Sequence, residues 1–323
     1  MTLASGVGSH PGTDQHAFDE ALRLVLGELS LPYLPEVPGR LPGADMVGRS
    51  LALLSGLGAD LQPAGWRLGP SSGVDHRRAV SLLNQDLDAL EERTQGYTGP
   101  LKVQVAGPWT LAATVERPRG DRVLADVGAR RELAQSLAEG LTEFVAGVQR
   151  RVPGASLLVQ VDEPALPAVL AGWVPTASGF HRHRSVDAPL AAPALEWVLS
   201  AISSAGASPV VHCCAAEVPF DLLSRVGAPG ISVDLDVLRA SAYDEVAGVL
   251  EAGGWVFLGV VPSTRPASPP TSVTPRVERF LEMLGLEPAP NLVLTPACGL
   301  AGADPAWART ALEMCRTAAA DLG

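Results

Sequence analysis

The sequence predicts an α/β protein, specifically a (β/α)8 TIM barrel. Eight short β-type runs recur along the chain, and amphipathic helical patterns fall between them. The later β-type runs are continuously apolar, as expected for parallel strands that are buried on both faces. The chain has 323 residues, a length that suits one barrel of this kind.

The strands are expected in this order: Val7–Pro11, Leu31–Pro38, Leu101–Ala106, Leu157–Val161, Pro209–Cys214, Ile231–Asp234, Trp255–Val261 and Leu292–Thr295. Prolines within Leu31–Pro38 count against a regular strand there, because proline cannot donate a ladder hydrogen bond. Alternation ends at Gly107-Pro108 after the third strand, which indicates a strand-to-helix turn.

Helices are expected from a cap at Thr13 or Asp14 and then over 44–57, 75–93, 130–151, 190–205, 240–251, 274–284 and 305–322. Residues 58–73 have turn chemistry throughout and suggest a hairpin-like excursion. We therefore expect one catalytic barrel over residues 1–323, with an excursion at about 58–98 between the second and third strands.

Composition excludes several classes of protein. The net charge of −11 argues against a nucleic-acid or anionic-membrane partner. No apolar run reaches transmembrane length, and the first residues lack the basic and apolar regions of a signal peptide. Four cysteines do not make a disulfide framework in a chain this size. We therefore expect a cytoplasmic protein with reduced thiols.

Three soft metal ligands end two of the predicted strands. His212 and Cys214 end one strand, and Cys298 follows another. If these strands end on the same side, the three side chains form an N/S set suited to zinc. The alternative is that the cysteines are buried core thiols. Active sites of barrels lie at the carboxyl ends of the strands, where this chain also carries Asp, Glu and Ser, and this placement favours the metal site.

The fourth zinc ligand stays open among three carboxylates. Asp234 ends the next strand and is the first candidate, with Asp236 and Glu217 as the others. Asp234 could instead cap the helix that follows it. Strand alternation turns Cys213 into the barrel wall, and Cys315 is expected in the core.

Zinc held by two thiolates and one imidazole suits thiol chemistry. The metal lowers the pKa of a substrate thiol and keeps it ionised at neutral pH, which allows alkylation of the sulfur. Hydrolysis by zinc-bound water is the rival use, and it is more typical of His and carboxylate ligands.

Other strand ends offer contacts to a substrate. Asp162, followed by Glu163, could bind an ammonium group or pair with a neighbouring basic side chain. Val7-Gly8-Ser9 could offer donors to a carboxylate, although Ser9 could also serve only as a loop cap. His181 and His183 lie in a basic loop that is expected to face solvent; the alternative is a loop that contacts a phosphate.

Several stretches together resemble the C-terminal catalytic barrel of cobalamin-independent methionine synthase, which is related to the uroporphyrinogen decarboxylase-like barrels. They are Gly6-Val7-Gly8-Ser9, Gly107-Pro108-Trp109-Thr110-Leu111, Gln160 to Leu166 (QVDEPAL), His212-Cys213-Cys214 and Pro296 to Leu300 (PACGL). They span nearly the whole chain in the family's order. Long members of the family carry an additional N-terminal barrel.

The resemblance implies a zinc ion held by His212, Cys214 and Cys298, with Asp234 at the position of a family Glu. It also implies an amino-acid substrate held by Val7, Ser9, Glu36 and Asp162. The implied reaction moves a methyl group to the thiolate of homocysteine and gives methionine.

The donor side departs from the family pattern. Ala168 stands where the family has a folate-contacting Glu, and Thr114 stands where it has a Trp. The family's proton-donating His falls within residues 261–264, which contain no His. Folate needs protonation on nitrogen to leave, so methyltetrahydrofolate is the less expected donor and a methyl-corrinoid, free or protein-bound, the more expected one.

Three alternative functions remain. The first is zinc-dependent alkyl transfer to another small thiol, such as a sulfonate-bearing one, which would need basic residues where Asp162 and Glu36 stand. The second is a uroporphyrinogen decarboxylase-like enzyme, which would need Arg clusters at the strand starts. The third is a barrel that binds metal without catalysis.

Overall fold

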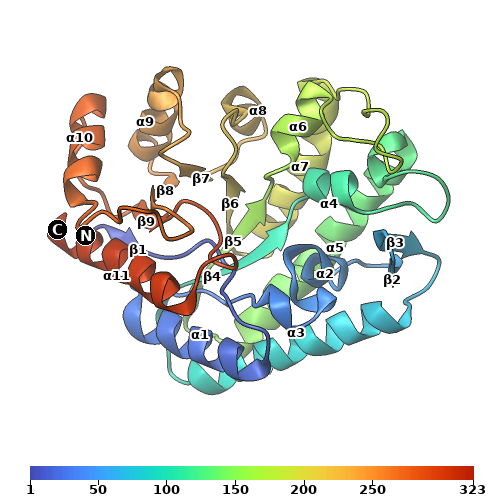
Figure 1. The fold of residues 1–323 in the computed structure, drawn as a ribbon, viewed down its shortest axis with the longest axis horizontal. Helices are drawn as coiled ribbons and strands as arrows, with labels where there is room; N and C mark the ends of the chain where they lie inside the picture. Colours follow the sequence, from blue (N-terminus) through green and yellow to red (C-terminus); the bar gives the residue numbers. More distant parts are fainter.

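The computed structural model describes residues 1–323 as a curled parallel sheet surrounded by helices, a (β/α)8 barrel (Figure 1). Its seven regular strands run in the order β1-β9-β8-β7-β6-β5-β4, and all of their pairings are parallel. They are β1 (Leu3–Ala4), β4 (Gly99–Ala106), β5 (Ala155–Asp162), β6 (Ser208–Cys213), β7 (Gly230–Asp234), β8 (Trp255–Val261) and β9 (Leu292–Pro296).

The predicted second strand closes the ring without forming a regular strand. Leu31 N donates to Ala4 O at 3.0 Å on one side, and Leu34 N donates to Lys102 O at 3.0 Å on the other. Isolated parallel bridges join Ser9 to Glu36 and Tyr33 to Lys102. The prolines of this segment remove ladder donors, so only part of the hydrogen-bond pattern forms.

The helices cover the outside of the sheet, and most agree with the predicted ranges. They are α1 (Gln15–Glu28), α2 (Met46–Leu51), α3 (Val74–Arg93), α4 (Pro108–Thr114), α5 (Val127–Arg151), α6 (Leu166–Ala171), α7 (Ala188–Ser204), α8 (Phe220–Arg225), α9 (Tyr243–Glu251), α10 (Thr274–Leu284) and α11 (Pro305–Asp321). Asp14 caps α1 by accepting a hydrogen bond from Ala17 N. The prediction of a helix over 44–57 was wrong in its length: α2 ends at Leu51, and a turn then leads to β2.

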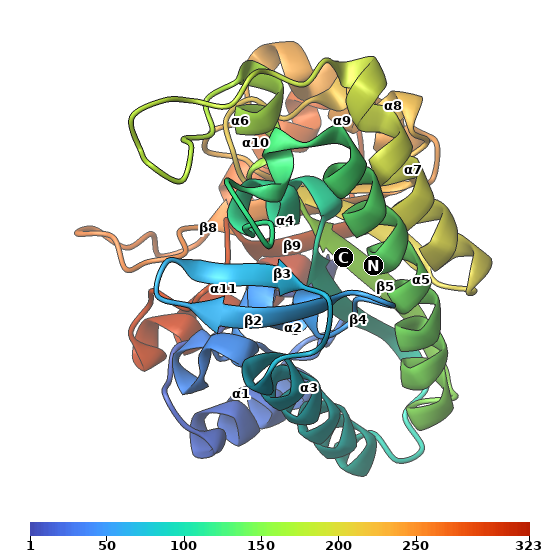
Figure 2. The same ribbon diagram turned by 90° about the vertical axis from the view of Figure 1, so that its right-hand side faces the viewer.

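A two-stranded hairpin stands apart from the main sheet. It consists of β2 (Gly58–Gln62) and β3 (Gly65–Gly69), paired antiparallel, and Figure 2 shows it between α3 and α4. This hairpin confirms the turn-rich excursion expected over 58–73. None of the helices combines the length and the apolar character that a membrane span requires.

The lumen of the barrel is apolar at one level and polar above it. Leu31, Leu158, Val210, Phe257 and Val293 form a small cluster of buried side chains that is separate from the main core. Because side chains alternate along a strand, the lumen-facing residues that follow toward the carboxyl ends are polar; they include Gln160 and Asp162 on β5, His212 on β6 and Ser232 on β7. The apolar level therefore supports a polar site at the carboxyl ends of the strands.

Candidate metal and amino-acid site

The three soft ligands meet at the carboxyl ends of β6 and β9. The Sγ atoms of Cys214 and Cys298 lie 3.2 Å apart, although 84 residues separate them in the chain. A ring nitrogen of His212 completes a group whose ligand atoms all lie within 4.8 Å of one another. Because β6 and β9 are parallel strands of one sheet, their carboxyl ends lie at the same rim. The sequence analysis had to take this arrangement as a condition.

The imidazole of His212 is oriented for a ligand. Its Nδ1 lies 2.9 Å from Ser232 Oγ on the neighbouring strand. Its Nε2 is buried and has no hydrogen-bond partner. Such an arrangement, with one ring nitrogen held by the protein and the other free, is typical of a metal-binding histidine. The three residues therefore fit a metal ion that accepts nitrogen and sulfur.

The contact between the two cysteine side chains shifts their pKa values in opposite directions. A hydrogen bond from the Cys214 thiol, together with the nearby His212, lowers the pKa of Cys298, and burial opposes this shift. The same hydrogen bond to Cys298, with burial second, raises the pKa of Cys214. The opposite pKa shifts favour the thiolate form at Cys298, and thiolate is the form that ligates metals.

The candidate fourth ligands lie outside this group. Asp234 is on the same face of β7 as Ser232, two residues closer to the rim, but its Oδ1 accepts a hydrogen bond from Asp236 N at 2.8 Å. The Asp236 carboxylate pairs with Arg276 at 2.7 Å, and Glu217 pairs with Arg239. Asp234 alone has no ion-pair partner, so it keeps the role of a proposed fourth ligand.

Asp162 lies in the same rim beside the metal group. The β5–β6 register places it directly opposite His212. Its Oδ1 accepts a hydrogen bond from Gln160 Nε2 at 2.7 Å, and no salt bridge engages it. Burial raises its pKa to about 6, and the nearby His212 and Lys102 oppose that rise. A buried carboxylate with no ion pair is suited to accept a cationic ligand group.

Lys102 is linked to the Asp162 carboxylate through the side chain of Gln160. Lys102 is fully buried, and its Nζ donates to Val7 O at 2.8 Å and to Gln160 Oε1 at 2.9 Å. Gln160 Nε2 in turn donates to Val7 O at 2.9 Å and to Asp162. Sequence reasoning missed Lys102 and Gln160. Each of them lies two residues before another polar side chain on its own apolar strand, Gln104 or Asp162. That spacing puts both members of a pair on the same face of the strand, and it is the signal that could have found them.

Glu36 and Ser9 lie on the neighbouring extended segments. Glu36 is 3% exposed, and its Oε1 accepts a hydrogen bond from Gln104 Nε2 at 3.1 Å. Burial raises the pKa of Glu36 to about 7, with Arg49 opposing the rise and Asp162 adding to it. Ser9 Oγ accepts a hydrogen bond from Ala301 N at 3.3 Å, in the loop that carries Cys298. Ser9 thus lies beside the loop of Cys298 and Glu36 beside Gln104, and their contacts with a substrate stay a prediction.

Glu163, next to Asp162, has a structural role. Its carboxylate accepts hydrogen bonds from Trp109 N at 2.9 Å, Thr110 N at 2.7 Å and Thr110 Oγ1 at 2.8 Å. It therefore caps the start of α4. Close approach explains Gly107 before that helix, because a Cβ atom there would lie 2.4 Å from the Glu163 carboxyl group.

The basic loop is only partly exposed. His181 is exposed, as expected, but His183 is 9% exposed and its Nε2 lies 3.2 Å from an Asp121 carboxylate oxygen. The prediction that His183 faces solvent was therefore wrong, because its side chain is buried against Asp121, which lies between α4 and α5. Cys213 and Cys315 are both buried, as expected.

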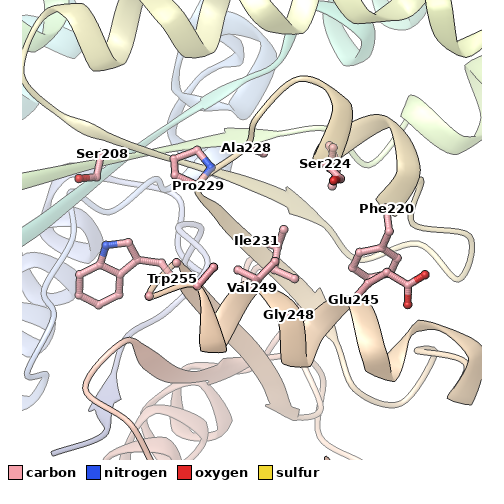
Figure 3. A pocket seen from close by; sticks show the side chains of 14 residues that line it. Ser208, Phe220, Ser224, Ala228, Pro229, Ile231, Glu245, Gly248, Val249 and Trp255 are labelled. Carbon is pink, nitrogen blue, oxygen red and sulfur yellow. The ribbon is translucent and has the colours of Figure 1, made fainter.

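A separate cavity of about 620 Å³ lies outside the barrel wall (Figure 3). It is lined by α8, α9 and the first residues of β6 and β8, including Phe220, Val249 and Trp255. None of the predicted site residues lines it. We therefore place the chemistry at the rim of the barrel, where the ligating groups are.

Comparison with known families decides among the barrel classes. Residues 98–321 match the family model described as "Cobalamin-independent synthase, Catalytic domain". The chain belongs to this family. The match includes His212, Cys214, Cys298 and Asp162, and it excludes the first segments with Val7, Ser9 and Glu36.

A solved relative extends the fold comparison to the whole chain. The structure of a B12-independent methionine synthase from Shewanella sp. W3-18-1, in complex with selenomethionine, has a TM-score of 0.60 and 15% identity, covering 99% of this chain and 96% of that chain. A structure of oxaloacetate acetylhydrolase with the product oxalate has a TM-score of 0.40 and 11% identity, covering 94% of this chain and 78% of that chain. Comparison with curated protein sequences gave no significant match. At 15% identity the methionine synthase structure shows the fold alone.

Proposed function

We propose that this protein is a zinc-dependent methyltransferase that moves a methyl group to the thiolate of homocysteine and forms methionine. The observation that carries the proposal is the His212, Cys214 and Cys298 group beside the unpaired Asp162 carboxylate. The first supplies nitrogen and sulfur ligands, and the second suits the ammonium group of an amino acid. Membership in the synthase family supports the same reaction.

The residues would divide the work as follows. His212, Cys214 and Cys298 would hold the zinc ion, with Asp234 as the fourth ligand. A bound zinc ion lowers the pKa of a substrate thiol and so supplies a thiolate at neutral pH. Asp162 and Glu36 would bind the substrate ammonium, while Ser9 and the backbone at Val7 would contact its carboxylate end.

The transfer itself needs few protein groups. A lone pair of the homocysteine sulfur forms the new S–C bond as the bond between donor and methyl breaks, and that electron pair stays on the donor. Orientation of the thiolate within the rim is therefore the main contribution of the protein.

The donor proposed is a methyl-corrinoid. Thr114 is exposed and its hydroxyl bonds to Thr110 O, while Ala168 offers no polar group. Residues 261–264, at the end of β8 and just after it, contain no histidine or other acid that could protonate a folate nitrogen. Methylcobalamin should therefore support methionine formation, and 5-methyltetrahydrofolate should not. Turnover with the folate would contradict the donor assignment and leave the thiol site intact.

Metal analysis with X-ray absorption at the zinc edge tests the thiol site. We expect one zinc per chain, with two sulfur ligands that become three when homocysteine is added. His212→Ala and Cys298→Ser should lose the zinc, whereas Cys213→Ala, which changes a wall cysteine next to the site, should keep it. A protein without stoichiometric zinc, or a sulfur count that homocysteine does not change, would refute the proposal.

A further inference from the structure

One amide oxygen in the lumen has no partner. Gln104, on β4, is 4% exposed. Its Nε2 donates to Leu34 O at 2.7 Å and to Glu36 Oε1 at 3.1 Å. Both contacts are oxygen acceptors, so they determine which branch of the amide is nitrogen. The other branch, Oε1, is buried and makes no hydrogen bond.

A buried polar atom without a hydrogen-bond partner, such as Gln104 Oε1, is unusual within the lumen. The neighbouring Lys102 Nζ and both polar atoms of the Gln160 amide have partners. His212 Nε2 is the other unpartnered atom on the lumen face, and it belongs to the proposed metal group. Buried polar atoms in native proteins are nearly always hydrogen-bonded, so an exception at a site indicates a missing ligand group or a bound water.

The position of Gln104 indicates which ligand group is missing. The β4–β5 register places it level with Gln160, whose Nε2 donates to Asp162, and Glu36 lies on its other side. It also lies against Gly8, where a Cβ atom would be 2.8 Å from Gln104 Cδ. Gln104 therefore stands between the two carboxylates proposed to bind an ammonium group.

We propose that Gln104 Oε1 accepts a hydrogen bond from the ammonium group of the amino-acid substrate. Glu36, Asp162 and Gln104 then offer three acceptors to the three N–H bonds of an unsubstituted ammonium. This inference rests on the proposed function and deepens it, because it limits the substrate to thiols with a free primary amine. A deaminated thiol would leave the buried acceptors unpaired, which is a strong basis for rejection.

The test compares two ligands in two proteins. L-Methionine and its deaminated analogue 4-(methylthio)butanoate are titrated calorimetrically into the zinc-loaded protein, as wild type and as Gln104→Met. We expect the substitution to weaken L-methionine binding by roughly tenfold or more, as for a hydrogen bond to a charged group. Binding of the analogue should hardly change. Gln149→Met, on the remote helix α5, is the matched control and should alter neither affinity.

Three outcomes would count against the inference. Equal weakening of both ligands would show that Gln104 only maintains the shape of the lumen. Unchanged binding of both would show that a water molecule satisfies Oε1. If wild type does not prefer L-methionine to the analogue, the amino-acid site of the proposed function fails as well, and this result appears without any variant.

A second measurement does not depend on the variant folding. The side-chain amide signals of Gln104 in the 1H–15N spectrum of the wild type should shift on addition of L-methionine and stay in place with the analogue. Identical responses to both ligands would overturn the assignment.

Discussion

Substituting Ser232 with alanine should weaken zinc binding without removing a ligand. Ser232 is 1% exposed, and its Oγ lies 2.9 Å from His212 Nδ1. This contact holds the tautomer in which Nε2 is free for the metal. Loss of such an outer contact typically lowers metal affinity about 10- to 100-fold, or about 1.4–2.7 kcal/mol.

The same substitution should cost the metal-free protein only about 1 kcal/mol of unfolding free energy, the usual net value of one hydrogen bond. Competition with a chromophoric chelator measures the zinc affinity, and urea unfolding of the metal-free protein measures the stability. Ser208→Ala, at the exposed start of β6, is the matched control. If Ser232→Ala and Ser208→Ala release zinc at the same chelator concentration, Ser232 does not orient His212 and the reasoning is refuted.

Three further predictions concern stability, each measured by urea unfolding. Gly140→Ala in α5 should destabilise the protein by about 1–3 kcal/mol or more, since its Cβ would lie 1.7 Å from Leu53 O; Gly147→Ala in the same helix meets only the ends of arginine side chains and should not. Glu163→Ala should cost about 3–5 kcal/mol because it leaves three buried donors of α4 unpaired, and a cost below that of Glu163→Gln would contradict this account. Burial lowers the pKa of His10 to about 4, whereas a histidine in the unfolded chain has a pKa of about 6.5. The contribution of His10 to stability is therefore lost as pH falls below 6.5. The stability difference between wild type and His10→Gln should shrink by about 2 kcal/mol from pH 7.5 to pH 5. A difference that does not vary with pH would show that His10 protonates equally in both states.

Strand periodicity and strand-end chemistry were sufficient to predict the barrel. The regular strands other than β1, and most helices, lie where the apolar periodicities predicted them, because a strand buried on both faces and a helix buried on one face leave different sequence patterns. The first predicted strand was wrong: β1 is Leu3–Ala4, and the extended piece from Val7 contributes only an isolated bridge at Ser9. The exceptions have local causes. Leu31–Pro38 closes the ring with few ladder bonds because of its prolines, and α2 stops at Leu51 because a turn must lead into the hairpin.

The site was predictable only for residues whose chemistry is unusual by itself. His212, Cys214 and Cys298 are ligand types that end two strands, so their meeting could be inferred. Lys102 and Gln104 were not singled out, because a lysine and a glutamine in a strand are normally solvent-facing.

The sequence by itself thus determined the fold class, the rim on which the proposed site lies and the three residues of the candidate metal group. The tertiary structure decided the rest: that Glu163 caps a helix while its neighbour Asp162 stays unpaired, that His183 turns inward, and that Asp234 lies outside the metal group. The physical reason is that hydrogen-bond partners come from strands and loops distant in sequence. Periodicity indicates which face a side chain occupies, but only the packed barrel determines which donors and acceptors lie within reach of it.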